Sequence, residues 1–153
     1  MLDRLMNLNV RRMTMVFAGC VMLSAGAQMG DAPALRIQIL NGKTGRPVAH
    51  QHLALLRKDG KPLDGADKSS VTTDGEGYAP IPNVDAAVGD VVVFVDLHRP
   101  CSKTGKREFS LVGVRSKGVV SENACKPRIT MFPVAGTLIY FVRDETFLEK
   151  MRH

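Results

Sequence analysis

Apolar and polar positions after residue 34 follow a pattern typical of short β-strands separated by turns. Leu35, Ile37 and Ile39 alternate with Arg36 and Gln38, which predicts a strand with one buried face. Similar apolar runs predict further strands over residues 48–57, 91–97, 109–114, 119–120, 129–132 and 137–142. No window has a sustained 3.6-residue period, so we expect an all-β chain.

Two turn motifs frame the first half of this pattern. One is Thr44-Gly45-Arg46-Pro47-Val48, the other is Thr73-Asp74-Gly75-Glu76-Gly77-Tyr78, and an Asp59-Gly60 turn lies between them. This order of strands and turns resembles the carboxypeptidase regulatory-like and transthyretin-like (prealbumin-like) modules of secreted proteins. The resemblance implies a Greek-key β-sandwich of about seven strands, two of which flank the second motif. Modules of this type serve as spacers, adhesins, glycan binders and occasionally enzymes, so the fold alone assigns no activity.

Composition limits the architecture and the ligand class. The 153 residues are 44% apolar and 24% charged, which is enough for one domain and its core. Aromatic residues make up only 5% and Trp is absent. This disfavours an aromatic platform for stacking sugar rings or unpaired bases, so any ligand-binding face is expected to be polar.

The N-terminal segment is predicted to be a secretory signal covering residues 1–27. Three arginines precede an apolar run over residues 14–23, which ends in Ala25-Gly26-Ala27, a small-residue cleavage site. The run is too short to be read as a membrane span. The mature chain is therefore expected to begin near Gln28 and to be secreted or periplasmic.

Two alternatives to this signal remain. Phe17-Ala18-Gly19-Cys20 is similar to a bacterial lipoprotein box, which would leave Cys20 as a lipidated N-terminus. The pair Arg11-Arg12 suggests twin-arginine export.

Signal removal leaves two cysteines, Cys101 and Cys125. An extracytoplasmic compartment favours disulfides, and the spacing matches neither C-x-x-C nor a zinc site. We therefore expect a structural disulfide that closes a loop of about 25 residues and contributes roughly 3 kcal/mol in the chain-entropy model.

The segment around these cysteines is strongly basic. Within residues 99–128 the only acidic residues are Glu108 and Glu122. The disulfide is expected to draw the ends of the segment together into a cationic patch that attracts an acidic protein, an acidic glycan or an anionic lipid surface. The alternative is a solvated charged face. Nucleic acid is not expected as a partner after export. The basic residues are Arg99, Lys103, Lys106, Arg107, Arg115, Lys117, Lys126 and Arg128.

The last residues, 144–153, are predicted to form a short helical tail after a sandwich domain over residues 28–143. Asp144 is a candidate N-cap, and Phe147, Leu148 and Met151 share one face. So short a helix needs something to pack against. The face is expected either to dock on the sandwich edge or, with Lys150 and Arg152, to contact a partner or a membrane.

Metal-binding and catalytic patterns are weak. His50 and His52 would share one face of a strand and could bind Zn²⁺ or Cu²⁺ if a third ligand approached, whereas exposed polar residues explain them equally well. Acidic loop residues from Asp59 to Asp85 lack the spacing of a calcium loop. No G-x-S-x-G, H-E-x-x-H or P-loop motif occurs. We expect no cofactor and no catalytic residues.

These observations predict a secreted, non-catalytic accessory module of the cell envelope that engages a protein through its basic disulfide-closed region. The alternative is a carbohydrate-binding module for acidic polysaccharide. A flat cationic surface beside an exposed Phe147 and Leu148 favours the first, and a concave groove lined by Arg, Asn and Tyr favours the second.

Overall fold

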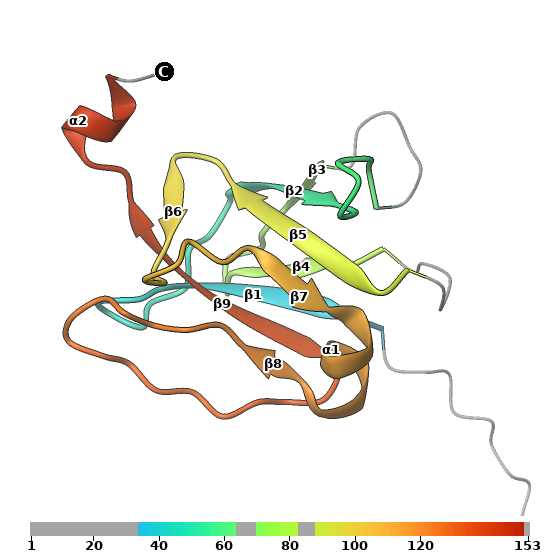
Figure 1. Ribbon diagram of the computed structural model, residues 1–153. Helices are drawn as coiled ribbons and strands as arrows, with labels where there is room; N and C mark the ends of the chain where they lie inside the picture. Colours follow the sequence, from blue (N-terminus) through green and yellow to red (C-terminus); the bar gives the residue numbers. More distant parts are fainter. Residues whose placement is uncertain (1–33, 64–69, 83–87, 152–153) are drawn as a thin grey trace, which may run out of the picture.

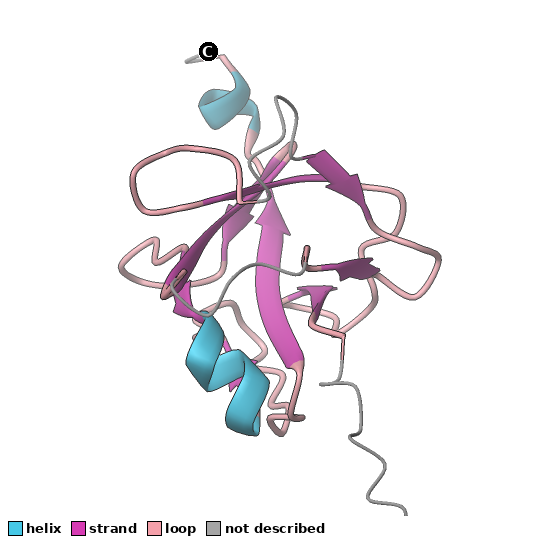
Figure 2. Cartoon of the chain, turned by 90° about the vertical axis from the view of Figure 1, so that its right-hand side faces the viewer, coloured by secondary structure: helices cyan, strands magenta, loops and turns pink. Residues whose placement is uncertain are grey.

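The computed structural model describes residues 34–63, 70–82 and 88–151, which form two β-sheets packed face to face and two short helices (Figure 1, Figure 2). This confirms the predicted all-β sandwich with a short C-terminal helix. In the described chain, neither helix is long and apolar enough to cross a membrane. The predicted signal segment with Cys20, and the acidic residues Asp64, Asp67 and Asp85, lie outside the described residues.

Sheet A has the order β4-β1-β9-β6, and β8 also pairs with β9. Sheet B has the order β3-β2-β5-β7. The helices lie at opposite ends of the molecule (Figure 1, Figure 2). The strand and helix bounds are β1 Arg36–Asn41, β2 His52–Leu56, β3 Ser70–Thr72, β4 Tyr78–Pro80, β5 Asp90–Val95, β6 His98–Pro100, β7 Glu108–Ser110, α1 Leu111–Lys117, β8 Val119–Val120, β9 Thr137–Asp144 and α2 Phe147–Lys150.

Strand β9 occupies the centre of sheet A. It runs parallel to β1, with Arg36 opposite Thr137 and Asn41 opposite Val142. On its other side, β6 pairs with the C-terminal half of β9 and β8 with the N-terminal half. Its alternate residues face sheet B, where they join the inward rows of β1, β2 and β5 in the main core. The β9 members of this core are Leu138, Tyr140 and Val142.

A second, smaller apolar cluster covers the outer face of sheet A. Ile139 and Phe141 of β9 point to this side, where they contact Cys101 and Leu40. Ile129, from the long connection between β8 and β9, packs against the same cluster. Because this connection covers the face, β9 is buried on both sides, unlike the edge strands.

Helix α1 corrects the prediction of a strand over residues 109–114. Ser110 ends β7 and caps the helix, because its hydroxyl accepts a hydrogen bond from the amide of Gly113. Leu111 and Val114, three residues apart, are both buried against the core. Gly118 then ends the helix with a positive φ of 79°.

Other predicted strands also change. Residues 129–132 form no strand, since they lie in the connection that covers sheet A. The strand predicted over residues 48–57 is shorter, because only His52–Leu56 pairs in a sheet. Strand β6, His98–Pro100, was not predicted; its backbone pairs with β9, although its sequence is short and polar.

The second turn motif is explained by a buried threonine and a capping carboxylate. Thr73 is only 1% exposed, and its hydroxyl donates to the carbonyl of Val48 and accepts from the amide of Gln51, both at 2.9 Å. The Asp74 carboxylate accepts from the amide of Tyr78 at 2.8 Å. The motif therefore holds the chain before β2 against the turn before β4.

Candidate functional site

The predicted disulfide is confirmed. Cys101 and Cys125 are bonded, with their Cα atoms 5.4 Å apart. Cys101 is 3% exposed and lies in the outer cluster of sheet A, and its amide donates to the carbonyl of Phe141 at 2.9 Å. On the other side, Gly42 lies against the sulfur of Cys101, where any side chain would collide. The disulfide is thus fixed to the centre of the sheet.

The structure divides the eight predicted patch residues into three groups, by position and by contacts. Around the disulfide, Lys103 follows Cys101 in the loop after β6, and Lys126 and Arg128 follow Cys125. Lys106 lies close to the same loop, because its amide donates to the hydroxyl of Ser102 at 2.8 Å. These four are exposed, and in the described part of the structure none of them forms an ion pair.

Two of the predicted residues lie at the far end of the sheet. Arg115 and Lys117 belong to α1, which leads into β8, where Val119 lies opposite Leu138. Arg99, near the disulfide, lies opposite Arg143. Leu138 and Arg143 are five residue steps apart along β9, a distance of about 17 Å. The structure thus places Arg115 and Lys117 apart from the cations around the disulfide, because α1 carries the middle of the disulfide-closed segment away from its ends. Binding through the basic residues stays a prediction.

The remaining two cations are engaged within the molecule. Arg99 forms an ion pair with Glu145, with 2.8 Å between Nε and Oε1. The guanidinium of Arg107 lies 4.6 Å from the ring centroid of Phe94, in the range of a cation–π contact. Both side chains thus serve intramolecular contacts.

The C-terminal tail is anchored by charge. Arg143 makes two hydrogen bonds to the carboxylate of Glu149, at 2.7 and 2.8 Å, and this carboxylate also accepts from the amide and hydroxyl of Thr146. These contacts hold the pKa of Glu149 well below its ordinary value. Thr146 caps the helix through its hydroxyl, so the predicted Asp144 cap is wrong and a Thr-x-x-Glu capping box takes its place.

The apolar face predicted for the tail does not dock along its length. Leu148 is 70% exposed and Met151 is 68% exposed. This overturns the expectation of docking on the sandwich edge for these two residues. Both side chains are exposed to solvent, and helix α2 lies at the same end of the molecule as β6 (Figure 1).

The histidine pair is not arranged as predicted. His50 lies in a bend with a φ of 56°, whereas His52 begins β2 and its Nδ1 lies 3.2 Å from the hydroxyl of Thr72. The two imidazoles therefore do not share a strand face. His98 contacts Asp144 at 3.2 Å. Within the described ranges, no group of three His, Cys, Asp or Glu residues could hold a metal ion.

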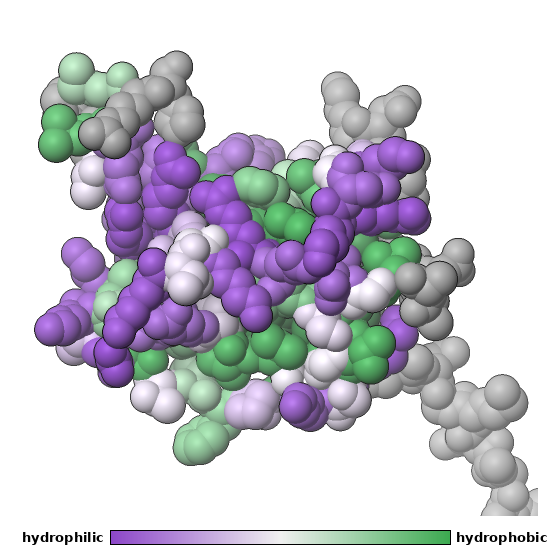
Figure 3. Space-filling view, viewed as in Figure 1, coloured by the Kyte–Doolittle hydropathy of each residue, from purple (hydrophilic) through white to green (hydrophobic). Residues whose placement is uncertain are grey.

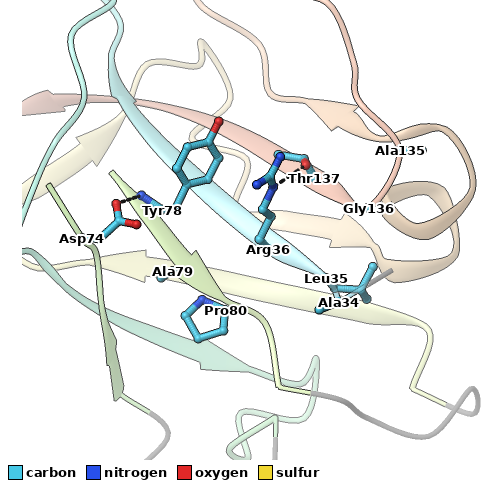
Figure 4. Close-up of a pocket in the computed structure, with 10 residues that line it drawn as sticks. All are labelled: Ala34, Leu35, Arg36, Asp74, Tyr78, Ala79, Pro80, Ala135, Gly136 and Thr137. Carbon is cyan, nitrogen blue, oxygen red and sulfur yellow. Dashed lines mark hydrogen bonds between the residues drawn. The ribbon is translucent and has the colours of Figure 1, made fainter. Parts of the chain in front are cut away.

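A hollow that the sequence did not indicate lies at the edge of sheet A. It has a volume of about 470 Å³ and lies between β4, the start of β1 and residues 135–137. The guanidinium of Arg36 lies 4.6 Å from the ring centroid of Tyr78, and its Nε donates to the hydroxyl of Thr137 at 3.1 Å. The side chains of Arg36 and Tyr78 rise from neighbouring strands into this hollow (Figure 4).

Sequence reasoning missed this hollow because it depends on pairing between distant strands. Arg36 was placed on the solvent face of its strand and Tyr78 in a turn motif. Only the registers of β1 with β4 and with β9 bring Arg36, Tyr78 and Thr137 together.

Tyr140, the second tyrosine, belongs to the core. Its ring meets that of Phe109 edge to face, with 5.4 Å between centroids. Burial raises the pKa of Tyr140 to about 12. The phenol therefore stays neutral across the physiological range and is enclosed between the sheets.

Comparison with known proteins adds one structural likeness. No family profile matches the chain, and no curated protein matches it. Among solved structures, the chain is similar to a crystal structure of a variant of BcpA, the major pilin subunit of Bacillus cereus, with 18% sequence identity and a TM-score of 0.41. The alignment covers 72% of this chain and 29% of the pilin chain.

Proposed function

We propose that this chain is an extracytoplasmic, non-catalytic binding module that engages an acidic protein surface of the cell envelope. The observation that supports this proposal is the set of four exposed cations in the two loops joined by the disulfide, none of which forms a salt bridge within the described residues. They are Lys103, Lys106, Lys126 and Arg128. Exposed cations that form no salt bridge keep most of their charge available to an outside ligand, and among these four Lys106 also interacts electrostatically with Glu108.

The support beneath these cations is rigid. Cys101 is held by the Phe141 carbonyl and packed in the outer cluster, and Asn123 binds the carbonyls of Gly42 and Ile129 at 2.9 and 3.1 Å. Side chains on a fixed frame lose less freedom on binding than side chains on a mobile loop. The basic surface is therefore preorganised for a complementary acidic one.

A charge-removal experiment tests this proposal. We expect Lys103→Gln with Lys106→Gln to weaken capture of a protein from the native envelope under mild cross-linking, and raised ionic strength to act in the same direction. The matched control is Arg57→Gln with Lys61→Gln, which removes two exposed charges from the turn after β2. Equal recovery with both double variants would overturn the proposal.

Export and processing belong to the same proposal. We infer cleavage after Ala27, a sandwich domain over residues 28–143 and a tail over residues 144–153, with Cys20 lipidation as the alternative processing. The disulfide supports an oxidising compartment. Intact mass and N-terminal sequencing of the protein from its native cells would separate a chain beginning at Gln28 from a lipidated chain beginning at Cys20.

A second candidate, binding of an acidic polysaccharide, is favoured by the hollow at Arg36. A guanidinium stacked on Tyr78 beside the Thr137 hydroxyl offers charge and hydrogen-bond donors to a sugar carboxylate. In calorimetric titration with polyuronic acid oligosaccharides, Arg36→Gln should abolish binding, whereas Arg46→Gln, at an exposed position in another turn, should not. No binding by the unmodified protein would exclude this candidate.

A further inference from the structure

The connection between β8 and β9 presents a run of exposed apolar side chains. Met131 is 37% exposed, Phe132 is 83% exposed and Val134 is 51% exposed, and Pro133 between them is also exposed. Because its side chain is so exposed, the ring of Phe132 projects beyond its neighbours. In Figure 3 an apolar protrusion stands at the lower margin of the molecule, along which this connection runs in Figure 1. Clustered apolar exposure of this type marks an interaction site.

Both ends of the apolar run are fixed to the folded body. Ile129, just before it, packs in the outer cluster of sheet A. Just after it, the amide of Gly136 donates to the carbonyl of Val114 in α1 at 2.8 Å. Gly118 lies so close to the backbone of Val134 that a side chain would collide. The run is thus held outward at both of its ends.

Cations border the run on both sides. Lys126 and Arg128 precede it, and α1, whose end contacts Val134 through Gly118, carries Arg115 and Lys117. From residue 123 to residue 143 the sequence has no Asp or Glu. The result is a projecting apolar tip with positive charge around it.

We propose that this tip, residues 126–134 with the adjoining end of α1, docks on the surface of an anionic lipid bilayer. Phe132, with Met131 and Val134, enters the interfacial region, where aromatic side chains are favoured. The flanking cations lie at the level of the lipid phosphates, each contributing about fivefold to the partition coefficient.

The shape and chemistry of the tip favour a bilayer over a protein. The run projects outward and pairs in no strand, and Pro133 has no N–H with which to extend a partner's sheet. A fluid interface accommodates a projecting ring without a matching pocket, whereas a protein partner must supply one. This membrane contact shares Lys126 and Arg128 with the proposed function, whereas Lys103, Lys106 and the tail take no part in it. Phe132→Ser therefore tests the membrane contact alone, and Lys103→Gln with Lys106→Gln tests the proposed function alone.

The absence of Trp allows a direct test. A chain that begins at Gln28 retains every described residue, both sheets and both apolar clusters. In it, Phe132→Trp places a single Trp at the tip, and Leu148→Trp places one at a similarly exposed site on α2. With vesicles of phosphatidylglycerol and phosphatidylcholine, we expect a blue shift and quenching by brominated acyl chains for Phe132→Trp, and neither for Leu148→Trp.

Two further variants complete the test. Lys126→Gln with Arg128→Gln should lower the partition coefficient about 25-fold at low salt, and Phe132→Ser should lower it on the order of tenfold. Three outcomes would overturn the proposal: no blue shift at position 132, an equal shift with pure phosphatidylcholine vesicles, or a shift that depends on protein concentration without vesicles. The last of these would identify a second copy of the chain as the occupant.

Discussion

Thr73 offers a quantitative test of how the second turn motif holds the sandwich together. Its hydroxyl is buried and makes two hydrogen bonds of 2.9 Å, donating to Val48 and accepting from Gln51. Thr73→Val keeps the branched shape but removes both bonds. Two neutral bonds contribute about 2 kcal/mol, and leaving their partners unpaired adds about 1 kcal/mol. Burial of the new methyl group offsets about 1 kcal/mol of this loss of stability. We therefore expect the free energy of unfolding to fall by about 2 kcal/mol.

The neighbouring residue supplies the control. Thr72 is exposed, and its hydroxyl contacts only the imidazole of His52 among the described residues. Thr72→Val should change the free energy of unfolding by less than about 0.5 kcal/mol. Urea denaturation of both variants with the disulfide intact, followed by circular dichroism, measures the difference. If Thr73→Val matched Thr72→Val within error, the hydroxyl would not hold the motif together and the reasoning would be refuted.

Three further predictions follow from backbone geometry and titration. In urea denaturation, Gly118→Ala should lower the free energy of unfolding by at least about 1 kcal/mol more than Gly60→Ala does. Both glycines have a positive φ, but only Gly118 lies against neighbouring backbone. Equal losses of stability in the two variants would contradict this prediction. Tyr78→Phe leaves Tyr140 as the single tyrosine, and absorbance titration of this variant should place the pKa of Tyr140 near 12. The free energy of unfolding should fall as pH rises above 10.0, because the phenol of the unfolded chain loses its proton first. A titration midpoint near 10.0 would contradict the burial of Tyr140. Because the pKa of Glu149 is lowered, amide protection in α2 measured by hydrogen exchange should be full above pH 4.5 and should decline as pH falls from 4.5 through the much lower pKa of the folded state. A Glu149→Gln variant should show low protection throughout this range.

Local patterns in the sequence predicted the sandwich well. The alternation of Leu35, Ile37 and Ile39 set the buried face of β1, and all three belong to the main core. The strand predicted over residues 137–142 is β9, extended by two residues. The turn at Thr73 also lies where the resemblance implied, with β3 before it and β4 after it. Each of these features depends on neighbours within a few residues, which a single sequence reveals.

Features that depend on distant contacts were not predicted. The run from Phe109 to Val114 is compatible with a strand, and only the Ser110 cap and the packing of Leu111 and Val114 against the core make its later part helical. The division of the basic segment was not predicted for a similar reason. Its residues are close in sequence, but α1 separates Arg115 and Lys117 from the disulfide in space. The hollow at Arg36 was not predicted either, since it requires the pairing of β1 with both β4 and β9.

The position of β9 has a consequence for how the chain acquires its structure. This strand lies between β1, the first described strand, and β6 and β8, each of which pairs with one half of its other edge. In sequence, however, it is the last described strand. Arg36 and Thr137, which lie side by side in the ladder, are separated by 101 positions along the chain. Until residues 137–144 pair with β1, that strand lacks its central neighbour and both apolar faces of sheet A stay open. Formation of this sheet therefore requires contacts between residues at opposite ends of the domain sequence, a topology that slows folding and prolongs the exposure of apolar strands.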